Sequence, residues 1–147
     1  HLAFAGMRNG KWAIWKDGEA VPVDMQIRET VSQRVPVGRP QFSPDSKRIA
    51  YHARGPANPR GVWVVDGKPG LGTEGVSEDG FNFSPDSAHY CYFYGGGRGK
   101  GYGIVVDGKL RATHLHVLGL VFRDDGSLEY LALNEDKQLF RYRITGY

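Results

Sequence analysis

The stretch Phe42–Ser46 (FSPDS) decides the fold, because it returns twice later in the chain. A second copy is Phe83–Ser87 (FSPDS), and a diverged copy is Phe122–Gly126 (FRDDG). The copies start at positions 42, 83 and 122, so they lie 41 and 39 residues apart. A period of roughly 40 to 45 residues is typical of propeller blades, each of which is one four-stranded antiparallel sheet. The repeat therefore predicts an all-β chain.

A second motif follows the first at a fixed distance. It occurs as Val64–Lys68 (VVDGK) and Val105–Lys109 (VVDGK), and each aspartate lies 24 residues after the phenylalanine of its repeat. The chain opens with a third copy, Trp15–Glu19 (WKDGE), so its N-terminus enters a repeat part-way through. Two motifs that recur together at one spacing indicate the same sheet built several times.

The linked motifs resemble the WD40-like (PD40) propeller repeats of bacterial TolB-type proteins, over nearly the whole chain. The resemblance implies a bacterial β-propeller, and it favours a periplasmic or extracellular location. It implies no particular activity, since one propeller scaffold hosts many unrelated roles. The chain departs from the family pattern at Ser46 and Ser87, which replace the usual turn glycine, and at Arg123 and Asp124, which replace Ser-Pro.

Turn signals divide the 147 residues into about four blades within one propeller domain or propeller segment. The predicted blades span about 1–38, 39–78, 79–117 and 118–147, and the first and last are incomplete. An open sheet edge invites pairing with another chain. We therefore favour a segment of a larger propeller, or one part of an assembled one. A four-bladed ring closed within this chain is the alternative.

Composition restricts the class of protein. The 19 basic and 16 acidic side chains give a net charge of +3, which is too mild to predict a nucleic-acid partner. No run of about 18 apolar residues is present to span a membrane. The one cysteine, Cys91, lies in an apolar strand and is interpreted as a buried, inert thiol. Strand aromatics are expected to fill the space between blades: Trp12, Trp15, Trp63, Tyr92, Phe93 and Phe140.

Basic residues gather in the predicted hairpin loops between second and third strands, at 6–10, 54–60 and 95–101. They are Arg8 and Lys11, Arg54 and Arg60, and Arg98 and Lys100. The resemblance places these loops together on one face, where positive charge would favour an anionic ligand or an acidic protein surface. The acidic Glu74, Glu78 and Asp79, expected in a blade connection on that face, would cancel part of this charge. Solvated loop residues without a partner are the alternative interpretation.

No catalytic motif is found. The loop Gly95–Gly101 (GGGRGKG) lacks the final Ser or Thr of a Walker loop and precedes a predicted strand instead of a helix, so we interpret it as a hairpin tip. No serine stands in a Gly-x-Ser-x-Gly elbow. The repeated Asp45, Asp86 and Asp125 are interpreted as turn caps, with calcium ligands or catalytic acids as alternatives.

Two histidines, His114 and His116, stand two residues apart on the predicted strand Leu110–Val117 and would share one of its faces. Such a pair can supply half of a metal site, but no cysteine pair or carboxylate follows at a supporting interval. Ordinary strand histidines are the favoured interpretation, and no cofactor is expected.

Taken together, the sequence predicts a non-catalytic protein-interaction or scaffolding propeller that binds an anionic partner on its loop face. The expected partner is a protein, or another copy or segment that completes the propeller. No nucleic acid and no membrane span are expected. The alternative is a propeller domain that gates or accompanies a hydrolase whose catalytic residues lie outside this chain.

Overall fold

The computed structural model describes residues 2–8, 11–21, 38–55, 58–72, 75–95 and 101–147. These residues form strands and turns and include no helix, so the predicted all-β class is confirmed for them. In particular, the described ranges hold no helix of the length and apolarity needed to cross a membrane.

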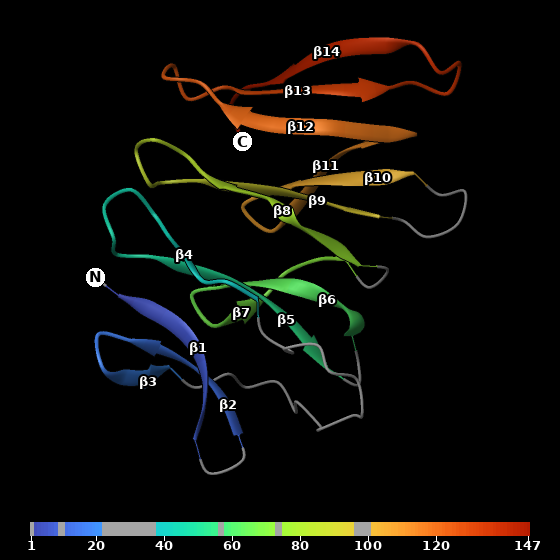
Figure 1. The fold of residues 1–147 in the computed structure, drawn as a ribbon. Coiled ribbons are helices and arrows are strands. Elements are labelled where there is room, and N and C mark those ends of the chain that lie inside the picture. The colour runs from blue at the N-terminus through green and yellow to red at the C-terminus, as the bar shows by residue number, and fades with distance from the viewer. Residues whose placement is uncertain (1, 9–10, 22–37, 56–57, 73–74, 96–100) are drawn as a thin grey trace.

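The strands of the described ranges form four antiparallel sheets, in which neighbours in sequence are neighbours in space (Figure 1). Sheet A contains β1 (Ala3–Arg8), β2 (Lys11–Lys16) and β3 (Glu19–Val21). Sheet B contains β4 (Gln41–Phe42), β5 (Ile49–Gly55), β6 (Asn58–Val65) and β7 (Lys68–Pro69). Sheet C contains β8 (Val76–Phe83), β9 (Tyr90–Gly95), β10 (Tyr102–Val106) and β11 (Lys109–His114). Sheet D contains β12 (His116–Phe122), β13 (Leu128–Leu133) and β14 (Leu139–Ile144).

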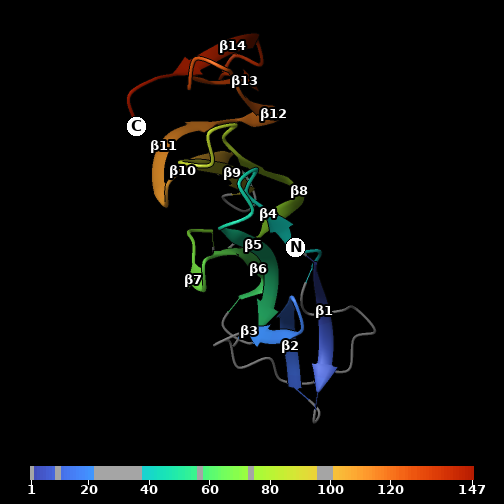
Figure 2. The same cartoon turned by 90° about the vertical axis from the view of Figure 1, so that its left-hand side faces the viewer.

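The four sheets stack face to face in chain order, with sheets A and D at opposite ends (Figures 1 and 2). Successive side chains of a strand point to opposite faces, so each inner sheet serves two cores. In β5, for example, Ile49 and Tyr51 belong to the core shared with sheet A, whereas Ala50 belongs to the core shared with sheet C. The described residues form an open stack, with sheets A and D at opposite ends, and not the ring that was the expected alternative (Figure 1).

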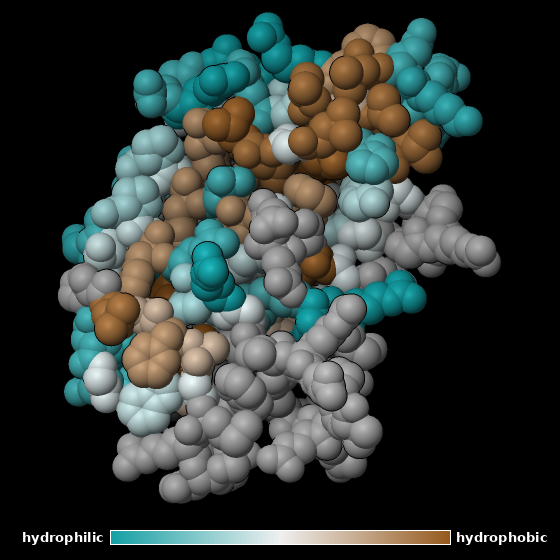
Figure 3. Space-filling model, in the orientation of Figure 1, coloured by the Kyte–Doolittle hydropathy of each residue, from teal (hydrophilic) through white to brown (hydrophobic). Residues whose placement is uncertain are grey.

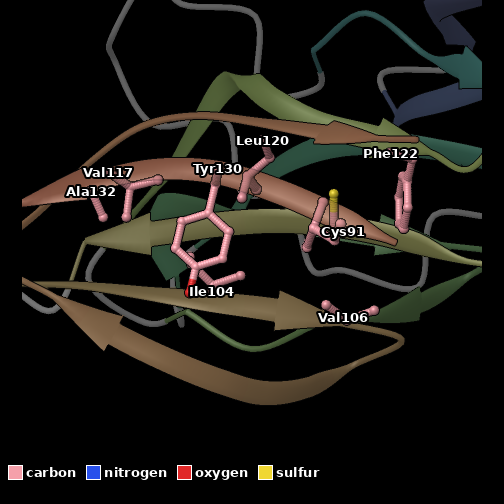
Figure 4. Packing of buried hydrophobic residues seen from close by; sticks show 9 residues of the cluster. Cys91, Ile104, Val106, Val117, Leu120, Phe122, Tyr130 and Ala132 are labelled. Atoms are coloured by element: carbon pink, nitrogen blue, oxygen red, sulfur yellow. The ribbon is translucent and has the colours of Figure 1, made fainter. Parts of the chain in front are cut away.

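The core between sheets C and D shows how tightly the faces meet (Figure 4). Cys91, Ile104 and Val106 of sheet C pack against Val117 and Leu128 of sheet D, and all five are at most 3% exposed. Burial raises the pKa of the Cys91 thiol, because the charged thiolate loses its hydration. The interpretation of Cys91 as a buried thiol is confirmed.

The FSPDS turn is held by a hydrogen-bonded serine and aspartate. The buried Ser43 hydroxyl donates to Asp45 Oδ1 at 2.6 Å and accepts a bond from the Arg48 N–H at 3.0 Å. Ser84 and Asp86 repeat this arrangement in the second copy. In each case the aspartate caps the turn between first and second strands, as predicted.

The diverged third copy keeps the cap with a different serine. Arg123 stands where the earlier copies have serine. The turn is also one residue shorter: the Arg123 N–H donates to Ser127 O, four residues later, whereas the Ser43 N–H donates to Arg48 O, five residues later. Asp125 Oδ1 instead accepts bonds from the N–H and the hydroxyl of Ser127, at 2.9 and 2.6 Å. The predicted role of Asp125 is confirmed, although its partner lies on the other side of it.

Serine replaces the expected turn glycine for a structural reason in one copy. Ser46 and Ser87 have φ angles of 61° and 65°, in the left-handed region that glycine adopts at lower cost, and Gly126 has 78° at the matching place. The Ser87 hydroxyl accepts a hydrogen bond at 2.9 Å from the N–H of Asp45, which lies in the neighbouring sheet's turn. This bond links sheets B and C and offsets the backbone cost of the serine.

The Asp-Gly motif lies at a constant distance from the FSPDS motif because both belong to fixed places in the same sheet. Asp66 and Gly67, with φ of 51° and 78°, form the hairpin turn between third and fourth strands. Asp66 Oδ1 also accepts the N–H of Ile49 at 3.0 Å, and Asp107 Oδ1 accepts that of Tyr90 at 3.1 Å. Each aspartate therefore ties the end of the third strand to the start of the second.

Two predicted hairpin loops prove shorter than expected, because the strands extend further. In sheet A the pairing continues to Arg8 opposite Lys11, so the range 6–10 is not all loop. In sheet B a bulge between Ala53 and Gly55 lets the ladder continue to Gly55 opposite Asn58. The third predicted loop, 95–101, agrees with the strand ends at Gly95 and Tyr102.

The turn caps predict a stability that depends on acid. Hydrogen bonds from Ser43 and Ser84, and then from backbone N–H groups, lower the pKa values of Asp45 and Asp86 below 3.8. Each cap therefore stabilises the fold above pH 3.8, and this contribution is lost as the pH falls through the lowered pKa. The double variant Asp45→Asn/Asp86→Asn should be less stable than the wild type at neutral pH.

The measurement is urea unfolding at neutral pH and at about pH 3. The difference between wild type and double variant should shrink in acid, because protonation removes the same charge from the wild type. Asp136→Asn, on the exposed turn between β13 and β14, serves as the control and should behave as the wild type does. A difference that is equal at both pH values would contradict the role of the charged caps.

Candidate binding surfaces

The C-terminal ends of the second strands β5, β9 and β13 lie toward the right of Figure 1, and the FSPDS turns lie on the left. Two of the six predicted rim residues have described side chains: Arg54, half-buried on β5, and Arg60, exposed on β6. Both therefore lie on strands and not in a loop, which corrects the prediction. The bulge beside Ala53 lengthens the ladder and moves them there.

The other four rim residues are only partly placed. Arg8 and Lys11 face each other in the backbone register of β1 and β2, but their side chains lie outside the described part, as do Arg98 and Lys100 entirely. Glu78 and Asp79 belong to β8 and not to a connection, because β8 begins at Val76; Glu74 is outside the described residues. The rim as a whole stays a prediction.

His114 and His116 do not share a strand, which corrects the basis of the proposed pair. The chain bends at Leu115, whose N–H donates to Leu133 O in sheet D, so His114 ends β11 and His116 begins β12. His114 Nε2 lies 3.0 Å from the Tyr130 hydroxyl, and His116 Nδ1 lies 3.1 Å from Val117 O. Burial lowers the pKa of His114 and raises that of Tyr130 to about 12. Within the described ranges, no three His, Cys, Asp or Glu side chains are grouped to hold a metal ion.

The outward face of sheet D, here called the D face, presents apolar side chains, and no other sheet of the described residues covers it (Figures 2 and 3). Its exposed apolar side chains come from all three strands: Leu118 and Val121 on β12, Leu131 on β13 and Leu139 on β14. Hydrophobic side chains gather over this end of the stack in Figure 3. A bulge between Val117 and Gly119 interrupts the register of β12 with β13. Beside it lies a hollow of about 330 Å³.

Charged groups border this hollow. Arg123 and Glu129 form an ion pair with 2.7 Å between Nη2 and Oε2, and Arg143 pairs with Asp125 at the turn. The Ser127 bonds and the Arg143 guanidinium lower the pKa of Asp125, so that carboxylate stays charged at neutral pH. Arg141 lines the hollow and has no ion pair or hydrogen bond with any described residue. The face thus combines an apolar floor with an unmatched positive charge.

The outward face of sheet A, here called the A face, presents aromatic side chains among its described residues. Phe4 is 48% exposed and stacks on Trp15, with 6.4 Å between the ring centroids. Phe4 lies opposite Trp15 in the register of sheet A, and Tyr51 lies opposite Val64 at the same place in sheet B. In sheet B, Tyr51 and Val64 are both buried against sheet A. The A face therefore has the composition of an internal face.

Sequence reasoning missed both end faces as surfaces. It expected Trp15 and Phe140 in the core, whereas Trp15 lies on the A face and Phe140 is 46% exposed. Trp63 and Tyr92 are buried as expected, Phe93 is half-buried, and the side chain of Trp12 lies outside the described part. The available signal for the D face was the strict alternation of apolar and charged residues along Phe140–Ile144, which indicates a strand with one covered and one exposed face.

No model of a known protein family matches the chain, and no curated protein matches it as a relative. The resemblance to TolB-type repeats thus depends on the two linked motifs alone.

Proposed function

We propose that this chain is a segment of a TolB-type, WD40-like β-propeller, and that it acts as a non-catalytic protein-interaction or scaffolding module. The observation that carries the proposal is the contrast between inner and end faces. Every inner sheet face is covered by its neighbour, whereas the A face and the D face present large apolar side chains to solvent. Surfaces of this kind mark sites of protein association.

The repeat supports a propeller as the completed assembly. Four sheets of one strand plan stack in chain order, and radial repetition of such sheets is the propeller architecture. Within the described ranges, sheet A has no first strand and sheet D has no fourth strand, in contrast to sheets B and C. A further sheet on the A face would cover Phe4 and Trp15 as sheet A covers Tyr51 and Val64. The partner expected on the A face is accordingly another repeat, from a second copy or from a longer chain.

Size in solution tests this proposal. Light scattering on the 147-residue chain should give a mass above the 16.3 kDa of one chain, increasing with concentration, because the A faces of two copies associate. Phe4→Glu should shift the population toward the monomer by placing a charge on the A face.

Leu110→Glu is the matched control, since Leu110 is equally exposed, at 48%, but lies on β11 at the side of the stack. It should leave the mass unchanged. A compact monomer at all concentrations, or equal effects of the two variants, would refute association through the A face.

A further inference from the structure

The three strand registers allow the outward positions of sheet D to be compared with the same positions in sheets B and C. The first and second strands meet at Phe42 opposite Ile49, at Phe83 opposite Tyr90 and at Phe122 opposite Leu128. Counting from these residues identifies the cross-strand pairs that point toward the next sheet. Four such pairs are His52 with Trp63 and Ala50 with Val65 in sheet B, and Phe93 with Ile104 and Cys91 with Val106 in sheet C.

The same two pairs in sheet D are Leu131 with Arg141 and Glu129 with Arg143. In sheets B and C these positions pack into a core, and seven of the eight side chains are buried, Phe93 being half-buried. In sheet D three of the four are charged. Glu129 and Arg143 form ion pairs, but Arg141 has no such partner among the described residues. Burying an unmatched charge beneath an apolar sheet is strongly unfavourable, because the charge loses its hydration. A further sheet of the kind that covers B or C would therefore bury Arg141 without a carboxylate partner, so the D face requires a partner that supplies one.

The first strand of sheet D, β12, also differs from the first strand of sheet C, β8, at its outward position. Asn82 on β8 donates its amide to Leu120 O at 3.2 Å and so joins the first strands of sheets C and D. The corresponding residue of β12 is Val121, which has no such donor and is 45% exposed. The D face thus lacks the polar link that joins sheets C and D, and it carries Arg141 and Glu129 where sheets B and C have buried, uncharged side chains.

We propose that the D face binds a protein segment in which a carboxylate stands beside large apolar residues. The apolar residues occupy the hollow over Leu118, Val121 and Leu131, and the carboxylate pairs with Arg141. Arg141 supports an acidic partner because Arg123 and Arg143 already have carboxylate partners, whereas Arg141 has none among the described residues. Guanidinium groups bind carboxylates with two parallel hydrogen bonds, which provides specificity for such a partner. This inference deepens the proposed interaction function and depends on it.

The test is selection of random linear peptides from a display library on the wild-type chain and on Arg141→Glu. The wild type should enrich peptides with Asp or Glu next to Leu, Ile or Phe. Arg141→Glu should bind those peptides roughly tenfold or more weakly, because an attractive charge pair becomes repulsive. It should itself select Lys or Arg at the acidic position.

Arg111→Glu provides the matched control, since it reverses an exposed arginine on β11, outside the D face. It should retain the wild-type affinity. NMR methyl shifts locate the binding independently: a selected peptide should move the signals of Leu118, Val121 and Leu131 and leave that of Ile14, in the core between sheets A and B, unchanged.

Several outcomes would overturn the inference. One is the absence of acidic-apolar enrichment, and another is equal loss of affinity in Arg141→Glu and Arg111→Glu. Peptides that lose affinity in Arg54→Ala/Arg60→Ala but not in Arg141→Glu would place binding at the hairpin end, which refutes the D face while leaving an interaction module. A second copy that binds the D face through its Phe4 and Trp15 would also refute the inference. It would be seen as shifts of the Leu118, Val121 and Leu131 methyl signals in the chain without peptide, and Phe4→Glu would abolish these shifts.

Discussion

Trp63→Ala should lower the free energy of unfolding by about 3–5 kcal/mol, the range for removing a large aromatic side chain from a core. Trp63 is 1% exposed and lies in the core between sheets B and C. Its ring packs against Phe81 of sheet C, with 4.7 Å between centroids. No neighbouring side chain can fill so large a volume, so most of the cavity should remain. Since domains are stable by only about 5–15 kcal/mol, this loss is a large share of the total.

The measurement is urea unfolding followed by far-UV circular dichroism, because tryptophan fluorescence changes when Trp63 is removed. Phe140→Ala is the control: Phe140 is 46% exposed, and its truncation should change stability by about 0.5 kcal/mol or less. If Trp63→Ala does not fold, Trp63→Phe should fold with an intermediate loss. Equal stability of Trp63→Ala and Phe140→Ala would contradict the stacking of sheets B and C.

Gly61→Ala should destabilise the fold more than Gly18→Ala, although both glycines have nearly the same backbone conformation. Their φ angles are 88° and 89°, so an alanine at either position should cost about 1–2 kcal/mol for the left-handed region. At Gly18 an added methyl meets no atom within 4 Å, whereas at Gly61 it would overlap the buried ring of His52. Overpacking of that kind adds about 1–3 kcal/mol.

Denaturant midpoints of the two variants measure the difference directly, because the backbone cost cancels between them. Adding His52→Ala to Gly61→Ala should recover part of the loss, since the smaller side chain leaves room for the methyl. No recovery in the double variant, or equal midpoints for the two single variants, would show that the close approach of Gly61 to His52 does not matter.

The strand plan was predictable because it depends on local signals. Asp66 and Gly67 both adopt positive φ, which an Asp-Gly pair tolerates, and the alternation through Ile49–Ala53 fixes which side chains face which sheet. The turn caps were predictable for the same reason, since Asp45 and Asp86 bond to groups within two residues.

Strand ends were less predictable, since they depend on pairing. The ladder of sheet B continues past Arg54 because a bulge after Ala53 restores the register. No single residue in the sequence predicts this bulge. The strand expected over Leu110–Val117 divides at Leu115, whose N–H bonds to Leu133 in the next sheet. A partner 18 residues away decides that boundary, and it also separates His114 from His116.

By itself, the sequence determined the repeat, the all-β class and the chemistry of each turn, because these follow from backbone conformations set within a few residues. Only the tertiary structure decided which faces are covered. Whether Leu118 and Arg141 line a core or a surface depends on whether another sheet lies against them, and burial is a property of that contact and not of the strand. The tertiary structure therefore shows a difference that the motifs do not predict: one end of the stack is apolar at Phe4 and Trp15, and the other carries a charge at Arg141.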